Sequence, residues 1–219
     1  MYSFHKLDIR GYHQEPVPHT FFRQHEGSRH AAIVFAGQNI NCQHPTLYYP
    51  TRELLARGAD TLLVDYCLRP AFPTFSGEQL KACIEADTMA AYQALFREHA
   101  YQQVTLIGKS LGTLAMGYLV TAVPHMPKVQ AIWLTPHLKR REWRAQIQQA
   151  HPRSLFVIGT EDPHYDAQTL SELQKITQGE TLVIEGAEHL LELSSGINPS
   201  LQVMEQIIQT LQVFLSRNT

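Results

Sequence analysis

The sequence predicts an α/β protein in which a mainly parallel central sheet is covered by helices on both faces. Six short apolar runs, rich in β-branched and aromatic residues, have the character of strands buried on both faces. Segments with helical spacing follow these runs in regular alternation. A strand followed by a helix, repeated along the chain, is typical of such a sheet.

The predicted elements can be placed one by one along the chain. The core strands are expected at residues 31–36, 61–65, 104–107, 131–134, 154–158 and 181–184. The helices are expected at residues 46–57, 77–98, 111–121, 139–149, 166–177 and 199–215. The last helix shows its apolar face clearly, with Leu201, Met204, Ile207, Ile208, Leu211 and Phe214 recurring at three and four residues.

The N-terminal part of the chain differs from this alternation. Two alternating segments, 4–9 and 19–25, flank a turn-rich stretch and predict an antiparallel hairpin of edge strands. No repeat, low-complexity tract or charge run marks a boundary, so residues 1–219 are expected to form a single domain. The connection from residue 136 to 154 has room for one helix but not for an inserted lid, so we expect no cap domain.

Composition excludes several classes of function. The formal net charge is −2 and the charges are scattered, so neither nucleic acid nor a membrane surface is an expected partner. The N-terminus lacks the apolar core of a signal peptide, which predicts a cytoplasmic protein. No apolar stretch approaches the roughly 20 residues of a membrane-spanning helix. Nothing in the sequence sets the oligomeric state.

The cysteines and histidines do not form a metal-binding pattern. Cys42, Cys67 and Cys83 are widely spaced and odd in number, as expected for reduced thiols that pack in the interior. The twelve histidines include no HExxH motif and no pairing with cysteines. We therefore expect no metal and no cofactor.

The residues after the strand at 104–107 carry the strongest functional signal. In an open parallel sheet, ligands bind at the carboxyl ends of the strands. There the chain reads Gly108-Lys109-Ser110-Leu111-Gly112 and then continues as a helix. A nucleophile on so tight a strand-to-helix turn brings the residues two before and two after it into contact, which requires glycine at both places. The competing interpretation is a glycine-rich connection to a closely packed helix.

The turn also places main-chain N–H groups near the hydroxyl of Ser110. The first N–H groups of the helix have positive dipole character and can stabilise an oxyanion, and Leu111 would supply one of them. A phosphate-binding loop is excluded, because it would need a glycine five positions before Gly108, where Gln103 stands.

A serine nucleophile needs an imidazole to take its proton and a carboxylate to orient that imidazole. Residues 159–166 follow the fifth core strand and contain Asp162, while residues 185–189 follow the sixth and end at His189. The order is serine, acid, histidine. Asp166 stays open as the acid, although it would also suit the N-cap of the next helix. His164 and His137 stay open as the base.

At this point the chain resembles the α/β-hydrolase superfamily. Ser110, Asp162 and His189 follow the expected strands in the family's order, and Gly-Thr-Glu-Asp-Pro and Glu-Gly-Ala-Glu-His look like its acid and histidine loops. The size without a lid is similar to small carboxylesterases and dienelactone-hydrolase-like members. The family usually has His-Gly before its second oxyanion donor; this chain has Ala36-Gly37-Gln38, which implies the N–H of Gln38 as that donor.

The resemblance implies a serine hydrolase that cleaves a small carboxylic ester, or a related small-molecule acyl substrate, through an acyl-enzyme. Aromatic and histidine side chains in the loops after the strands are expected to form the pocket wall: Tyr66, Phe72, Phe75 and His137. Two alternatives stay open. One is a thioesterase, peptidase or acyltransferase using the same residues, and the other is a hydrolase-fold protein that binds without turnover.

Overall fold

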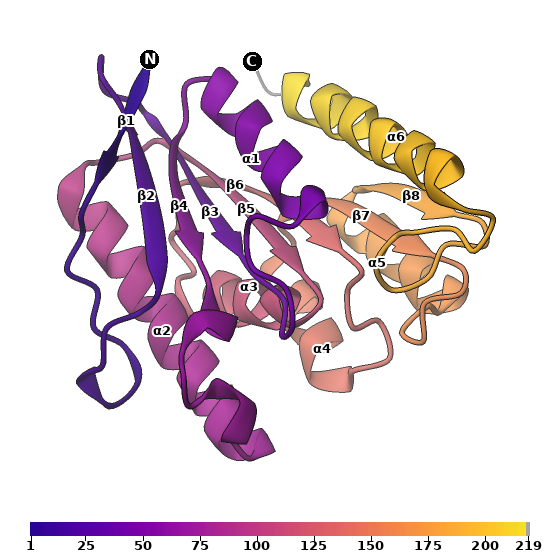
Figure 1. Cartoon of the computed structure of the whole chain (residues 1–219), viewed down its shortest axis with the longest axis horizontal. Coiled ribbons are helices and arrows are strands. Elements are labelled where there is room, and N and C mark those ends of the chain that lie inside the picture. The colour runs from indigo at the N-terminus through magenta and orange to yellow at the C-terminus, as the bar shows by residue number, and fades with distance from the viewer. Residues whose placement is uncertain (218–219) are drawn as a thin grey trace.

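The computed structural model describes residues 1–217, and within them eight strands form one mixed sheet (Figure 1). The strand order across the sheet is β1-β2-β4-β3-β5-β6-β7-β8. Neighbouring strands from β4 to β8 pair in parallel, whereas β1 and β2 add antiparallel strands at one edge. The predicted fold class is confirmed by this topology.

The bounds of the elements agree with the expected ranges to within a few residues. The strands are β1 Tyr2–His5, β2 His19–Gln24, β3 His30–Phe35, β4 Asp60–Val64, β5 Gln103–Lys109, β6 Lys128–Leu134, β7 Arg153–Gly159 and β8 Glu180–Ile184. The helices are α1 Pro45–Ala56, α2 Gly77–Glu98, α3 Leu111–Ala122, α4 Arg141–Ala150, α5 Ala167–Thr177 and α6 Ile197–Ser216.

Three differences from the sequence prediction have physical causes. Strand β2 is not an edge strand, because it pairs with β4 as well as β1 and its Phe21 is buried. Helix α4 begins later than expected, since residues 135–140 form turns closed by the N–H of Arg140 on the carbonyl of His137. Helix α6 begins at Ile197, ahead of Pro199, because proline is tolerated in the first turn of a helix.

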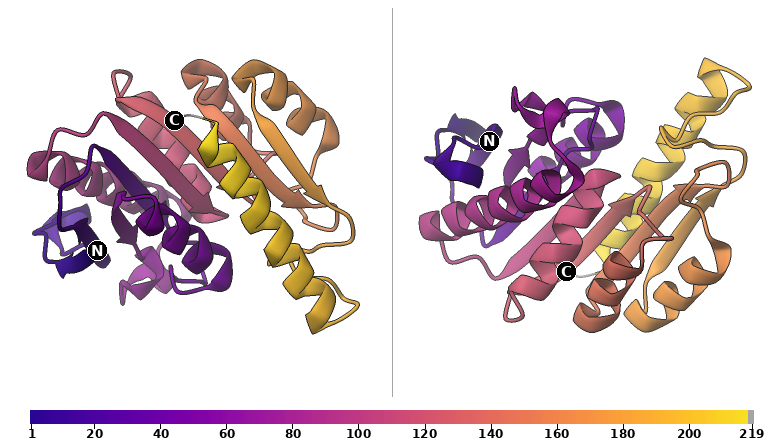
Figure 2. Two further views of the ribbon diagram at one scale, coloured as in Figure 1. Left: turned by 90° about the horizontal axis from the view of Figure 1, so that it is seen from above. Right: turned by 90° about the horizontal axis from the view of Figure 1, so that it is seen from below.

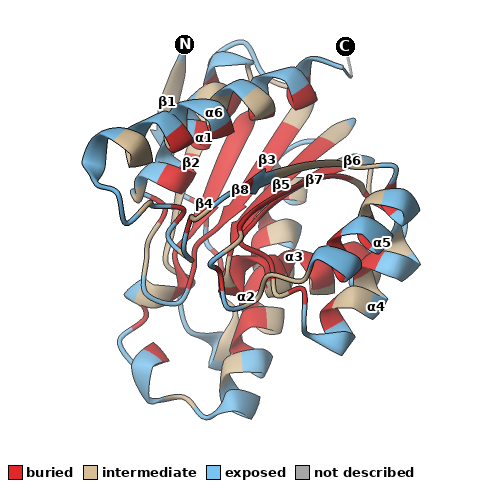
Figure 3. Cartoon of the chain, turned by 90° about the vertical axis from the view of Figure 1, so that its right-hand side faces the viewer, coloured by how far each residue is buried: buried red, intermediate tan, exposed pale blue. Residues whose placement is uncertain are grey.

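The helices form two layers on opposite faces of the sheet. Helices α1 and α6 lie over one face, and α2 to α5 lie over the other (Figure 2). Side chains alternate along β5, so Ile107 packs toward α1 and α6 while Leu106 packs toward the other layer. The inner strands are therefore buried on both sides (Figure 3). Among the helices of residues 1–217, none combines the length and apolar character that crossing a bilayer requires.

A buried ion pair attaches the chain after β4 to helix α2. Arg69 donates to both carboxylate oxygens of Asp87, at 2.7 and 3.0 Å, and the two side chains are 3% and 0% exposed. Asp87 also accepts the N–H of Tyr12 at 2.8 Å, and Arg69 forms a second ion pair with Glu15. The N-terminal segment, the connection after β4 and α2 are thus joined through one carboxylate.

Replacing Asp87 by alanine is expected to lower the free energy of unfolding by about 3–5 kcal/mol, because it leaves the guanidinium of Arg69 buried without its main partner. Urea denaturation measures this loss. Glu15→Gln is the matched control, since the Glu15 side chain is 56% exposed and its removal should cost no more than about 1 kcal/mol. Equal losses in the two variants would contradict the assignment of the buried pair.

Candidate active site

The turn that carries Ser110 has a strained main-chain conformation. Strand β5 ends at Lys109, helix α3 begins at Leu111, and Ser110 between them has φ 51° and ψ −114°. A positive φ is unfavourable for a residue with a side chain and persists only where the surroundings impose it. Here the N–H of Ser110 still donates to the carbonyl of Leu134 on β6 at 2.9 Å. The serine is thus held between a strand and a helix that both fix its position.

Two glycines allow the turn to be this tight. A Cβ on Gly108 would lie 2.6 Å from the main chain of Gly112. A Cβ on Gly112 would lie 2.2 Å from the carbonyl oxygen of Phe35, at the end of β3. Neither position has room for a side chain, which is the contact that the sequence motif predicts.

A continuous chain of hydrogen bonds connects Ser110, His189 and Asp162. Oγ of Ser110 lies 2.9 Å from Nε2 of His189, and Nδ1 of His189 lies 2.8 Å from Oδ2 of Asp162. The Asp162 carboxylate is the acceptor on Nδ1, which leaves Nε2 free to accept the serine proton. The second oxygen of Asp162 accepts the N–H of His164 at 2.8 Å. His189 is 27 residues from Asp162 and 79 residues from Ser110 in the sequence, and the sheet brings the three segments together.

Burial and hydrogen bonding act in opposite directions on Asp162. Its side chain is 0% exposed, and this burial raises the pKa of Asp162. The hydrogen bonds from His189 and from the N–H of His164, together with the charges of these two histidines, outweigh burial, so the pKa of Asp162 is lowered and the carboxyl group stays ionised. A charged acceptor is what the orientation of an imidazole requires.

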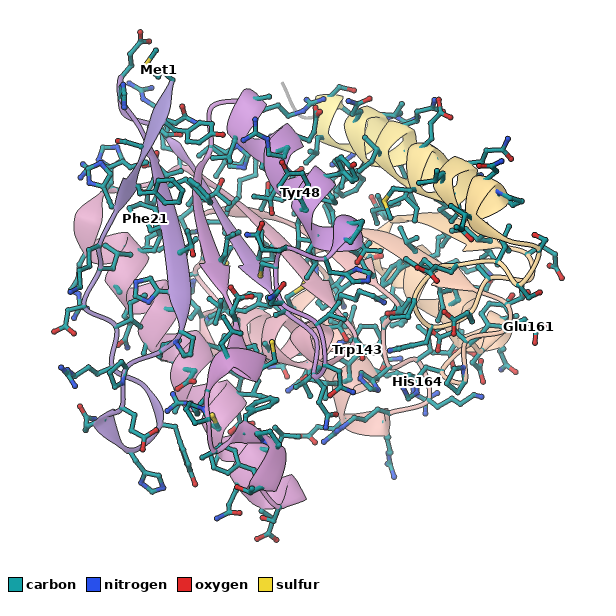
Figure 4. All side chains as sticks on the ribbon, in the orientation of Figure 1. Met1, Phe21, Tyr48, Trp143, Glu161 and His164 are labelled. Atoms are coloured by element: carbon teal, nitrogen blue, oxygen red, sulfur yellow. The ribbon has the colours of Figure 1, made fainter. Side chains whose placement is uncertain are left out.

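The other acidic residues near this end of the sheet lie elsewhere. Asp166 is the N-cap of α5, where its carboxylate accepts the N–H of Thr169 at 2.7 Å. Glu161 and Glu188 are exposed, and Glu161 points outward at the edge of the molecule (Figure 4). Of the two candidate acids, Asp162 and Asp166, the structure places Asp162 in contact with His189.

The two alternative histidines lie in a row with His189, with their rings tilted or edge-on to one another. The ring centroids of His137 and His164 are 4.1 Å apart, and those of His164 and His189 are 5.6 Å apart. No hydrogen bond joins His137 or His164 to Ser110 within residues 1–217. Burial, with His164 and His189 nearby, lowers the pKa of His137 to about 4, so this ring is neutral. Its Nε2 is buried without a partner among the described residues.

The main-chain groups expected to hold an oxyanion lie at the ends of β3 and β5. Leu111 is the first residue of α3, and the first N–H groups of a helix have no acceptor within it. The turn after β3 lies against the serine turn, since a Cβ on Gly37 would lie 3.4 Å from the carbonyl oxygen of Lys109. Gln38 follows in this turn with an exposed side chain.

Comparison with solved structures gives many close matches in fold. An esterase from Pyrococcus furiosus superposes with a TM-score of 0.71 at 15% identity, over 99% of this chain and 91% of that one. This chain has the α/β-hydrolase fold. An α/β serine hydrolase homologue from Coxiella burnetii gives a TM-score of 0.68 at 12% identity, over 96% and 97% of the two chains. Est1E from Butyrivibrio proteoclasticus, solved with bound ferulic acid, gives 0.67 at 11% identity, over 92% and 96%.

Sequence comparison adds nothing to this assignment. No protein-family model matches the chain, and no curated protein has a significant sequence match to it. Because the sequence identity to these structures is only 11–15%, the similarity establishes the fold of this chain alone. Its chemistry must be inferred from the residues of the site.

Within this hydrolase fold, Tyr66 and Phe72 do not form the expected pocket wall, because both are buried in the core. Tyr66 is 0% exposed, its hydroxyl shares a hydrogen bond of 2.6 Å with Thr88, and its ring stacks on Phe72. Phe75 packs edge-on against Phe72. The cause is local: the chain makes two 3-10 turns, Tyr66–Leu68 and Phe72–Thr74, which fold the rings of Tyr66 and Phe72 into the core and leave Phe75 half-buried against it. Among the predicted wall residues, His137 lies near His189, with the ring of His164 in contact with both.

The structure has two hollows near the candidate site that the sequence did not indicate, one lined in part by Leu111 and the other by Leu190. A cavity of about 60 Å³ lies between the starts of α2, α3 and α4. Its lining includes Leu111 and Trp143, the second of which is labelled in Figure 4. An open groove of about 370 Å³ begins next to His189 and is largely apolar; its lining includes His44, Tyr49, Leu190, Ile197 and Leu201. The apolar residues that follow His189 are the one sequence signal for this groove. The groove itself cannot be read from the sequence, because it is built from segments that are distant along the chain.

The described residues contain one group of side chains close enough to bind a metal ion together. It consists of Asp162, His164 and His189, whose possible donor atoms lie within 4.8 Å of one another. Asp162 already accepts hydrogen bonds from the His189 ring and the His164 N–H, while His189 also contacts Ser110. The ring nitrogens of His189 and the carboxylate of Asp162 are thus paired with one another and with the serine, while His164 contributes its main-chain N–H. This arrangement fits proton transfer rather than a ligand set.

Gly112→Ala is expected to destabilise the protein by about 1–3 kcal/mol, because the new Cβ would force the serine turn away from Phe35. Thermal unfolding measures the loss, and the rate at which a fluorophosphonate reacts with Ser110 should fall with it. Gly77→Ala is the matched control, since a Cβ there meets nothing within 4 Å. A Gly112 variant as stable and as reactive as the Gly77 variant would exclude the close contact.

Proposed function

We propose that this protein is a serine hydrolase that cleaves small carboxylic esters through an acyl-enzyme. The observation that carries the proposal is the hydrogen-bonded series from Oγ of Ser110 through His189 to the buried carboxylate of Asp162. A serine hydroxyl becomes an effective nucleophile when an oriented imidazole accepts its proton. Several structural neighbours of this chain are esterases, which favours an ester over other acyl substrates.

In the first half of the reaction, Oγ of Ser110 attacks the ester carbonyl while Nε2 of His189 takes its proton. The negative charge moves to the carbonyl oxygen, where the N–H groups of Leu111 and Gln38 stabilise it. The protonated His189 then gives its proton to the leaving alcohol, and the acyl group stays on Ser110. Asp162 holds the imidazole in position and stabilises its charged form throughout.

In the second half, water takes the place of the alcohol. His189 removes a proton from the water molecule, which attacks the acyl carbon and forms a second tetrahedral intermediate. Collapse of this intermediate breaks the bond to Oγ of Ser110, releases the carboxylic acid and returns the proton to serine. Ser110, His189, Asp162 and the two main-chain N–H groups supply every group in the cycle, so the reaction requires no cofactor.

Replacing Ser110 by alanine should abolish turnover of short p-nitrophenyl esters and leave the thermal unfolding midpoint close to that of the parent. Covalent labelling with a fluorophosphonate, located by mass spectrometry, provides the second measurement, and the label should be on Ser110 alone. Unchanged hydrolysis by the variant would overturn the proposal. A parent protein that never reacts with the probe would favour a binding protein without turnover, and faster thioester or amide cleavage would change the substrate class.

The role of Asp162 can be separated from that of Asp166 by the same conservative substitution at both places. Asp162→Asn should lower kcat on the order of 10⁴-fold, because an amide cannot stabilise the charged imidazole of His189. Asp166→Asn should change kcat by less than about twofold, since asparagine caps a helix as well as aspartate does. Steady-state kinetics on one ester decide between them, and a larger loss at Asp166 would reverse the assignment.

A further inference from the structure

Lys109, the residue before Ser110, is a buried lysine for which the proposed chemistry has no role. Its side chain is among the largest fully buried ones in the described part of the molecule and is 1% exposed. No carboxylate oxygen lies within 4.0 Å of its Nζ in residues 1–217, so it has no ion-pair partner there. Burying an ammonium group with no carboxylate in direct contact is costly. A lysine kept at such a place needs another explanation.

The hydrogen bonds of Lys109 indicate what the side chain does. Its Nζ donates to the main-chain carbonyl oxygen of His189 at 2.6 Å and to Oγ1 of Thr135 at 3.0 Å. The first bond joins residues 80 apart in sequence. It also joins the two segments that must keep a fixed separation for proton transfer, since Lys109 is bonded covalently to Ser110. A donor that carries a charge makes this the stronger kind of hydrogen bond.

The loop that carries His189 is anchored in the core on both sides of the histidine, by Ala187 and Leu191, which are 0% and 1% exposed. It begins at Gly186 and passes through Leu191, which have φ of 71° and 65°, and both Glu188 and Leu190 are exposed. On one side the loop is joined to the acid loop, through the N–H of Glu161 on the carbonyl of Ala187 and through the N–H of Gly186 on the hydroxyl of Thr160. The bond from Lys109 attaches the other side of the loop to the serine turn.

We propose that Lys109 is a positioning residue that fixes the main chain of His189 relative to Ser110, so that the imidazole stays within reach of the nucleophile. This inference rests on the proposed serine chemistry. The imidazole ring is held by Ser110 and Asp162, and the main chain behind it is held by Lys109. Without that attachment the ring could keep its bond to Asp162 and still move away from Oγ. A displacement of about 1 Å at a reacting group can cost 10²-fold in rate.

The charge on Lys109 links this contact to pH. Burial lowers the pKa of Lys109 to about 8, and the nearby carboxylates of Asp162 and Glu188 offset part of that effect. His44 and His189 are the other titratable groups that face it. As the pH rises through about 8, Nζ loses its charge, the bond to the His189 carbonyl weakens, and kcat should fall.

Stability should change in the opposite direction over the same range. An unfolded lysine titrates near the ordinary value of 10.5, above the folded pKa of about 8. Between these values the unfolded chain binds more protons than the folded one, so the contribution of this group to the free energy of unfolding rises with pH. Activity that declines while stability increases distinguishes a positioning charge from ordinary alkaline unfolding.

Lys109→Met removes the charge and the donor while keeping an unbranched side chain of similar length. On one p-nitrophenyl ester, kcat should fall by about 10- to 100-fold with KM within about twofold of the parent. The thermal unfolding midpoint at pH 7 should be equal or higher, because a buried charge has been removed. The decline of kcat above pH 8 should disappear. Lys175→Met, at an exposed position in the last turn of α5, is the control and should match the parent in every measurement.

The possible outcomes separate this inference from the proposed function. A parent that reacts with fluorophosphonate at Ser110, together with a Lys109→Met variant of unchanged kcat, overturns the role of Lys109 alone. A parent that neither turns over esters nor reacts at Ser110 overturns the serine chemistry itself. If the variant does not fold, the pH profile of the parent decides: a flat kcat from pH 7 to 9.5 contradicts the inference, and a decline near pH 8 in a folded protein supports it.

Discussion

The geometry of the candidate site depends on one close contact, the packing of the serine turn against the end of strand β3. A Cβ on Gly112 would lie 2.2 Å from the carbonyl oxygen of Phe35, so main chain meets main chain there without an intervening side chain. That contact holds Ser110 at a positive φ above the sheet. It also sets the turn after β3, with Gly37 and Gln38, beside the start of α3, where an oxyanion would have to be bound.

Around this contact the molecule buries several charged groups, and each has a particular set of partners. Asp162 is held by two hydrogen bonds and Asp87 by an ion pair with Arg69, so both carboxylates are compensated. Lys109 is different, because its partners are a carbonyl and a hydroxyl, both uncharged. Such a group lowers stability near neutral pH, and groups of this kind cluster beside the reactive residues of proteins.

The fold could be predicted from the sequence because the signals that define it are local. Runs such as residues 104–107 are buried on both faces and show it by continuous apolar composition, and helix α2 was placed at residues 77–98 from its spacing alone. The exceptions lie where tertiary contacts compete with local pattern. The local pattern of β2 predicts an edge strand, but β2 lies between β1 and β4. Its pairing with β4 depends on how distant parts of the chain meet, which a local sequence pattern does not show.

Part of the site could be predicted because its residues follow successive parallel strands, and the carboxyl ends of such strands lie at the same edge of the sheet. The sequence alone determined the α/β class, the serine turn with its two glycines, and the short set of acids and histidines that follow the later strands. Tertiary structure decided which of these meet: Asp162 reaches His189 while Asp166 caps α5, and Tyr66 and Phe72 turn into the core. It also joined Lys109 to His189, because hydrogen bonds across 80 residues depend on how strands align in space.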